Sequence, residues 1–312
     1  MTNRPLISVV SPVFGAERIV AELVQRITNA VEPLGDFEIV LVDDRSRDSG
    51  WLRIVEAARE RPQVRGVRLS RNSGQHAAIA AGLAESRGEY VVVMDCDLQD
   101  DPAEIPKLLA AARAGHDIVL TNHATRRHAR FRNVGARLYL RFIALLTSDD
   151  SETVGRGSYS LLSRKVVDAY NRIGDVQAHY LVNIKYLGFD QTLVEVQHDE
   201  RFEGASSYTF ARLVRHAADG VVANSLKLLN LVVVAGLALF GLSVLGVIGL
   251  IVNYFARGAL AGFTSLMVVF LLMTGAVLCS VGVVGLYVGR IFEQSRGRPR
   301  YFIDQRTGVD DE

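Results

Sequence analysis

The chain has 312 residues, enough for more than one domain, and its 35 basic and 34 acidic side chains leave a formal net charge of +1. A chain this close to neutral has no overall positive field, so the composition argues against nucleic acid as a partner. Its two cysteines, Cys96 and Cys279, lie far apart, and Cys279 falls inside an apolar run, so we expect no disulfide and a reducing compartment.

Residues 1–122 alternate short apolar runs with amphipathic stretches. The strand candidates are residues 6–13, 37–44, 64–70, 89–95 and 116–121. Between the first two candidates, apolar residues recur at the three- and four-residue spacing of a helix. This alternation predicts an α/β domain built on a parallel sheet, which we assign to residues 1–204. The apolar run at the N-terminus is too short for a signal peptide, so we expect this domain in the cytoplasm.

Residues 91–102, VVVMDCDLQDDP, form the most informative segment, because a buried strand runs directly into carboxylates there. Asp101 and Pro102 are typical of a helix start, which does not account for Asp95 and Asp97. Two carboxylates spaced in this way at a strand end can converge on one cation, and their hard oxygens suit Mg²⁺ or Mn²⁺, which bind diphosphates. The segment therefore predicts a metal–nucleotide site, with a plain polar loop as the alternative.

Two more strand candidates end in polar residues. Asp43 and Asp44 close the second strand, and Asn72 and Gly74 follow the third and lead into a helix. A glycine at a helix start lets backbone N–H groups approach a phosphate or a base. Ligands of open α/β sheets bind at the carboxyl ends of the strands, so three polar strand ends at one sheet edge indicate a ligand site.

The last third of the chain has a different character. No charged residue occurs in residues 228–256 or 258–289, and each run exceeds the roughly 20 residues that cross a bilayer as a helix. We therefore predict a transmembrane hairpin over residues 228–290, with a buried soluble hairpin as the alternative. Basic residues lie before the first run and after the second, so the positive-inside rule places both termini in the cytoplasm. The protein would then be a multi-pass protein of the inner (plasma) membrane.

Residues 205–227 place apolar side chains at helical spacing beside Arg212, Arg215 and His216. This pattern predicts an amphipathic helix that lies on the bilayer surface, with a helix packed on the soluble domain as the alternative. Residues 291–312 are left as a cytoplasmic C-terminal tail.

The motifs SVVSPVFGAE, VDDRSRDSGW, LSRNSGQHAAIAAGL and VVVMDCDLQDDP together resemble glycosyltransferase family 2 in order and spacing. Within that family the chain is similar to the polyprenyl-phosphate glycosyltransferases, which include dolichyl-phosphate mannose synthase and bacterial enzymes that act on undecaprenyl phosphate. The resemblance implies a GT-A (Rossmann-like) fold and an inverting transfer of a sugar from a nucleotide sugar to a polyprenyl phosphate. Similarity to the bacterial members favours a UDP-sugar.

The resemblance also implies roles for particular residues. Asp95 and Asp97 stand at the family's DxD motif, with Asp95 near the ribose and sugar and Asp97 on Mg²⁺ or Mn²⁺, and Arg201 stands where a basic residue meets phosphate. The residues expected to bind the nucleotide are Pro12, Phe14, Glu17, Asp43, Asn72, Gly74 and Asp95. The residues expected to meet the lipid phosphate are Arg201, Ser206, Ser207 and Tyr208.

The chain departs from the family pattern at two positions. Ser158 stands where many members have an Asp that is a proposed base, and Ser207 stands where many have a Lys. A lipid phosphate monoester has a second pKa of about 6, so near neutral pH it is largely dianionic and needs little help from a base. A sugar hydroxyl would need a base far more. The serine at position 158 therefore favours a phosphate acceptor.

Two other functions fit parts of the sequence. A polysaccharide synthase of the same family usually carries a Gln-x-x-Arg-Trp motif and more spans, whereas the single tryptophan here, Trp51, lies elsewhere. A non-catalytic, membrane-anchored subunit that binds sugar nucleotides would fit Ser158 and Ser207 but not the intact pair Asp95 and Asp97. Glycines in the predicted spans permit close helix packing, which is compatible with a homo-oligomer.

Overall fold

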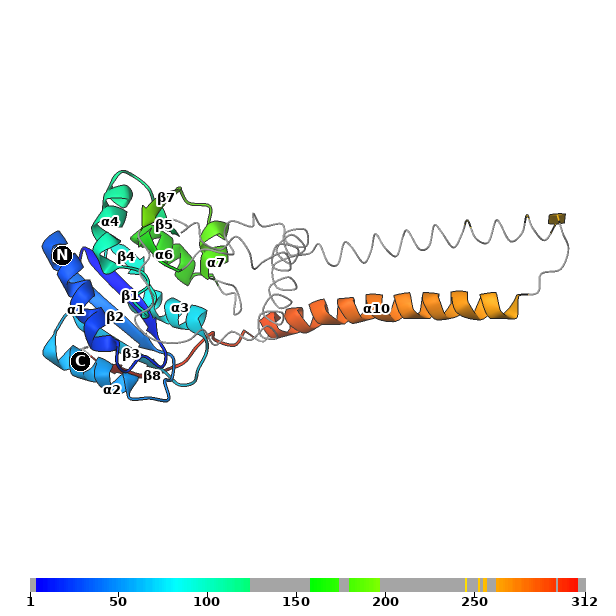
Figure 1. The fold of residues 1–312 in the computed structure, drawn as a ribbon, viewed down its shortest axis with the longest axis horizontal. Helices are drawn as coiled ribbons and strands as arrows, with labels where there is room; N and C mark the ends of the chain where they lie inside the picture. Colours follow the sequence, from blue (N-terminus) through cyan, green and yellow to red (C-terminus); the bar gives the residue numbers. More distant parts are fainter. Residues whose placement is uncertain are drawn as a thin grey trace, which may run out of the picture. The chain divides into compact units, whose positions relative to one another are not determined.

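The structure is a computed structural model, and it describes residues 4–123, 158–173, 180–196, 245, 252, 255–256, 262–295 and 297–307. The chain divides into two compact units (Figure 1). The first, here called the sheet unit, comprises Met1–Arg132, Ser151–Ser207 and Arg298–Glu312. The second, here called the helical unit, comprises Asn133–Asp150 and Tyr208–Gly297.

The described strands form one mixed sheet in the order β7-β5-β6-β4-β1-β2-β3-β8. They are β1 (Ile7–Val13), β2 (Phe37–Asp43), β3 (Val64–Leu69), β4 (Tyr90–Val93), β5 (Ile118–His123), β6 (Ser160–Ser163), β7 (Gln191–Val196) and β8 (Ile303–Thr307). β1 pairs in parallel with β2 and β4, β2 pairs in parallel with β3, and β5 pairs in parallel with β7. β6 is antiparallel to β4 and β5, and β8 is antiparallel to β3. The α/β prediction is confirmed, but the sheet is mixed because β6 and β8 run against their neighbours.

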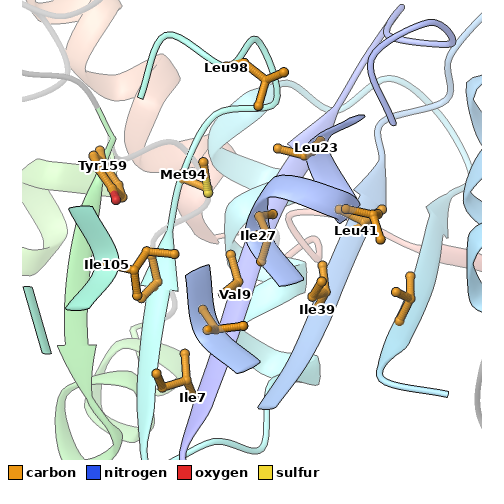
Figure 2. Packing of buried hydrophobic residues seen from close by; sticks show 14 of the residues in the cluster. Ile7, Val9, Leu23, Ile27, Ile39, Leu41, Met94, Leu98, Ile105 and Tyr159 are labelled. Atoms are coloured by element: carbon orange, nitrogen blue, oxygen red, sulfur yellow. The ribbon is translucent and has the colours of Figure 1, made fainter. Parts of the chain in front are cut away.

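Alternate residues of a strand point to opposite sides of the sheet, so apolar side chains project from both of its faces. Helices cover both faces and bury these side chains. Ile7 and Val9 of β1 belong to a core cluster with α1 (Val20–Val31), α2 (Gly50–Glu60) and α4 (Ile105–Arg113). Figure 2 shows this cluster, with Ile27 of α1 near Val9.

Val10 belongs instead to a second cluster, which includes residues of three other helices. These helices are α3 (Gln75–Glu85), α6 (Arg164–Asn171) and α7 (Tyr180–Tyr186). Two short 3-10 helices, η1 (Glu32–Leu34) and η2 (Pro102–Glu104), lie in the connections. The strands of the central sheet are buried on both faces, which explains their nearly continuous Val, Ile and Leu content.

The segment assigned to a C-terminal tail contributes the edge strand β8. Its Thr307 lies opposite Gly66 of β3, and a Cβ atom at Gly66 would come within 2.6 Å of the Thr307 side chain. Arg306 forms an ion pair with Glu85 of α3 at 2.9 Å, and the Arg300 guanidinium donates to a backbone carbonyl that follows α6 at 2.6 Å. A segment distant in sequence, β8, therefore covers the edge of β3 that would otherwise be unpaired.

The helical unit contains α10 (Phe263–Ser295), a helix of 33 residues with exposed apolar side chains that include Val269, Phe270 and Val277. Counting only the residues that the structure describes, no helix combines the length and the apolar character needed to cross a membrane. The predicted surface helix at residues 205–227 and most of the first predicted span lie outside the described residues.

Candidate active site

The parallel pairing of β1, β2, β3 and β4 brings the carboxyl ends of these strands to one edge of the sheet. The polar residues that end these strands in the sequence are therefore gathered there. The predicted strand ends lie within about two residues of the observed ones, because each strand is a compact apolar run followed by carboxylate, amide or hydroxyl groups.

Asp43 is fully buried at the end of β2. One carboxylate oxygen accepts a hydrogen bond from the Ser46 backbone N–H at 3.0 Å, and the other lies 3.2 Å from the Arg68 Nε of β3. The Arg68 guanidinium also lies over the Trp51 ring, 5.7 Å from its centroid. A buried carboxylate needs such partners, since its desolvation would otherwise be costly. Asp43 therefore fixes the corner where the chain leaves β2.

Asp44, the next residue, joins the end of β2 to the start of α3. Its two oxygens accept from the backbone N–H groups of Ser73 and Gly74 at 2.7 and 2.8 Å. Burial raises the pKa of the Asp44 carboxyl, while the two amide hydrogen bonds oppose that rise. Gly74 has φ +91°, a conformation that favours glycine. The Gly74 N–H, which we expected near a phosphate or a base, thus donates its hydrogen bond to Asp44.

Asp95 follows β4 and is held by two side chains from other parts of the chain. Its Oδ1 accepts from Gln75 Nε2, at the start of α3, at 2.7 Å and from Ser158 Oγ at 2.5 Å. Ser158 is the residue at the expected base position, so the structure joins that position directly to the predicted DxD motif. Gln75 was not singled out from the sequence, because a glutamine that begins a helix has no signal of its own.

Asp97 lies at a tight turn in the same loop. Its Oδ1 accepts from the Gln99 backbone N–H at 3.2 Å, and the intervening Leu98 has φ +58°. A left-handed leucine is strained, and such strain persists only where the surroundings enforce it. Leu98 is 2% exposed and belongs to the core cluster drawn in Figure 2. The buried leucine therefore anchors the turn that carries Asp97.

Asp100 adds a third carboxylate to this loop and is 4% exposed. Burial, together with the negative charges of Asp95 and Asp97, raises the pKa of Asp100 to about 7. No group of three or more His, Cys, Asp or Glu side chains in the described part of the chain forms a ready metal cage. Mg²⁺ commonly binds through one or two carboxylates and completes its shell with water and substrate phosphates, so Asp95 and Asp97 fit a metal shared with a diphosphate.

The β1–α1 loop lies against the β2–α2 loop at the same edge. The Gly15 N–H donates to Ser46 Oγ at 3.2 Å, and Glu17 Oε2 accepts from the Ser49 N–H at 3.2 Å. Phe14 is 52% exposed, whereas Pro12 is buried in β1. Of the two, Phe14 offers an aromatic face that the nucleobase of the donor could contact.

The remaining predicted site residues divide into two groups. Asn72 is exposed in the segment that leads into α3. The four residues expected to meet a lipid phosphate lie outside the described residues: Arg201, Ser206, Ser207 and Tyr208.

The chain is similar to known proteins. The model of a family described as "Glycosyl transferase family 2" matches residues 8–170, which contain Asp43, Asp95, Asp97 and Ser158. The chain belongs to glycosyl transferase family 2. A relative, "Uncharacterized glycosyltransferase YkcC" of Bacillus subtilis (strain 168), is 31% identical over 97% of this chain and 94% of its own length. As a family 2 member, the chain is a transferase of the GT-A type that takes its sugar from a nucleotide sugar.

Solved structures are more distant. Glucosyl-3-phosphoglycerate synthase from Mycobacterium tuberculosis, in complex with Mn²⁺ and UDP-glucose, is 17% identical with a TM-score of 0.47, over 70% of this chain and 77% of that one. S. aureus TarS 1–349 in complex with UDP-GlcNAc is 20% identical with a TM-score of 0.43, over 70% of this chain and 67% of that one. These scores are too low for either structure to inform the substrate of this chain.

Proposed function

We propose that this family 2 transferase moves a sugar from a UDP-sugar, with inversion, to undecaprenyl phosphate or another polyprenyl phosphate. The reaction would take place at the cytoplasmic face of the inner membrane, with Mg²⁺ or Mn²⁺ as cofactor. The hydrogen bond between Ser158 and Asp95 is the observation that favours a phosphate as the acceptor.

Ser158 Oγ donates to Asp95 Oδ1, so this position supplies a hydrogen-bond donor rather than a proton acceptor. A serine hydroxyl is not a base near neutral pH, and an acceptor hydroxyl would need one. A phosphate monoester is already largely ionised there, because its second pKa is about 6. The site is therefore better suited to an anionic phosphate acceptor than to a sugar hydroxyl.

The donor end of the proposal rests on Asp95 and Asp97. These carboxylates would hold a divalent metal against the donor diphosphate, and the bound metal would stabilise the leaving nucleoside diphosphate as a Lewis acid. The chain's own residues fix this arrangement: Gln75 and Ser158 orient Asp95, and the turn at Leu98 carries Asp97.

Attachment to the membrane is supported by the two uncharged runs and by the apolar side chains that α10 exposes. A long isoprenoid cannot leave the bilayer, so an enzyme that uses it has to work at the membrane surface. We assign the lipid phosphate to Arg201, Ser206, Ser207 and Tyr208, since a guanidinium can pair bidentately with phosphate.

The test uses the full chain purified in detergent, with undecaprenyl phosphate, Mg²⁺ or Mn²⁺ and a panel of UDP- and GDP-sugars. Mass spectrometry should show a lipid that gains one sugar from one donor. Asp97→Ala should abolish the product, because it removes a metal ligand. The matched control Asp36→Ala, at an exposed position just before β2 and so at the opposite end of that strand from Asp43, should retain it.

Other outcomes would point elsewhere. A product that grows by repeated sugar addition would indicate a polysaccharide synthase. Binding of UDP without transfer from any donor would indicate a non-catalytic subunit and would overturn the proposal.

A further inference from the structure

Arg45 occupies an unusual backbone conformation directly after Asp43 and Asp44. Its φ is +59°, a left-handed conformation that glycine adopts freely and that a long side chain adopts at a cost. Asp44 and Ser46 on either side are buried, whereas the Arg45 side chain is 43% exposed. The chain therefore keeps a strained arginine where glycine would fit more easily, which suggests that the arginine side chain has a role.

The partner of Arg45 comes from the C-terminal strand. Its guanidinium donates to Asp304 Oδ2 of β8 at 2.7 Å, across 259 positions of sequence. β8 reaches the same corner a second time, because Gln305 lies opposite Arg68, the residue that contacts Asp43. One edge strand thus supports both the exposed and the buried side of this corner.

The corner is connected to the rest of the proposed nucleotide site. The Ser46 N–H donates to Asp43, and Ser46 Oγ accepts from the Gly15 N–H, next to the exposed ring of Phe14. Because Arg45 precedes Ser46 directly, a change in the Arg45 backbone would move both of these hydrogen bonds.

We infer that Arg45 and Asp304 are positioning residues for the donor: their ion pair holds the corner at Asp43–Ser46 in the shape that receives the nucleoside diphosphate. β8 would then set the affinity for the donor without taking part in transfer. The inference rests on the proposed function, since it takes this edge of the sheet as the nucleotide site. A purely structural role, in which the pair only fastens β8, would change stability instead.

The test measures Mg²⁺-dependent UDP binding by calorimetry and steady-state transfer on the full chain. Asp304→Asn removes the ion pair, and Arg45→Gly removes it while relieving the backbone. Each should raise the UDP Kd and the donor KM by roughly three- to fivefold, the range expected when an exposed ion pair is lost. The kcat, the acceptor KM and the thermal midpoint should stay within measurement error.

Two further variants test whether the residues act as a pair. The double variant Arg45→Gly/Asp304→Asn should raise the UDP Kd and the donor KM no further than the single variant with the larger effect. The exchanged pair Arg45→Asp/Asp304→Arg should recover the wild-type KM, because aspartate tolerates the left-handed conformation.

The control is Glu56→Gln, which breaks the similarly exposed Arg53–Glu56 ion pair on α2, at 2.8 Å, and should leave the donor KM unchanged. If the single variants bind UDP as tightly as the wild type, or weaken only in step with a fall in thermal midpoint, the inference is wrong. If the wild type itself binds no UDP, the proposed function is wrong, and the inference, which rests on it, is wrong as well.

Discussion

Asp100 is a nearly inaccessible carboxyl group in the loop that carries Asp95 and Asp97, and its raised pKa makes stability depend on pH. Because the folded pKa is about 7 and the ordinary pKa of an aspartate is 3.8, the folded state binds the Asp100 proton more tightly than the unfolded state does. The contribution of Asp100 to the free energy of unfolding is therefore fully present below about pH 4 and is lost as the pH rises towards 7. The loss is at most about 4 kcal/mol.

Replacing the acid should remove this dependence. We expect Asp100→Asn to lose less stability than the wild type between pH 4.5 and pH 8 (roughly the window set by the two pKa values) in urea unfolding followed by circular dichroism. The exposed control Asp36→Asn should follow the wild-type profile. Parallel profiles for Asp100→Asn and the wild type would show that Asp100 titrates normally.

Single residues of the site could be predicted only where a sequence signal exists. Asp95 and Asp97 were predicted because carboxylates that directly follow an apolar strand stand out. Their surroundings could not be predicted, since the partners Gln75 and Ser158 lie 20 and 63 positions away from Asp95 and meet it only in the folded chain. The same holds for Asp44, which joins α3 through backbone amides that carry no side-chain signature.

At the scale of an element, the position of α3 against the sheet depends on Gly82, which has no side chain. A Cβ atom at Gly82 would clash with Val10 of β1 and lie 3.1 Å from the Val42 side chain of β2. Helix and sheet therefore pack closely at this point, and Gln75 at the start of the same helix reaches Asp95.

We expect Gly82→Ala to lower the free energy of unfolding by about 1–3 kcal/mol, the usual cost of overpacking a core, even though alanine favours helices. Denaturant unfolding of the full chain measures this change. The control is Gly275→Ala in α10, where a Cβ would meet no described residue within 4 Å and the sheet unit should unfold as in the wild type. Unchanged unfolding of Gly82→Ala would mean that α3 can move away from β1 without cost.

Among the elements, the buried N-terminal strands could be predicted from the sequence, whereas β6 and β8 could not. The five N-terminal strands were placed within about two residues, because each is a compact apolar run. β8 was not expected, since IDQRT exposes its three central residues and has no apolar periodicity. The antiparallel insertion of β6 between β4 and β5 could not be predicted either, because strand order and direction depend on pairings between distant segments.

At the scale of the whole molecule, the proposed membrane attachment can be tested on α10. We expect the full chain to remain with the membrane fraction after alkaline extraction. The double variant Val277→Arg/Val281→Arg places two charges on exposed apolar positions of the helix. Each charge costs about 3 kcal/mol at the centre of a span, so this variant should be extracted in part or wholly.

The matched control Val277→Leu/Val281→Leu should stay with the membrane, since it keeps these positions apolar. Release of the wild-type chain by alkaline extraction would contradict the proposed localisation.

The place of β8 also determines when the sheet unit can finish folding. Positions 70–302, or 233 residues, lie between the end of β3 and the start of β8. At about 5–20 residues per second, a ribosome needs roughly 10–50 s to add them. Throughout that interval β3 has an unpaired edge, which is a template for aggregation. We therefore expect the nascent sheet unit to be prone to aggregation at this edge until β8 has been made and has paired with β3.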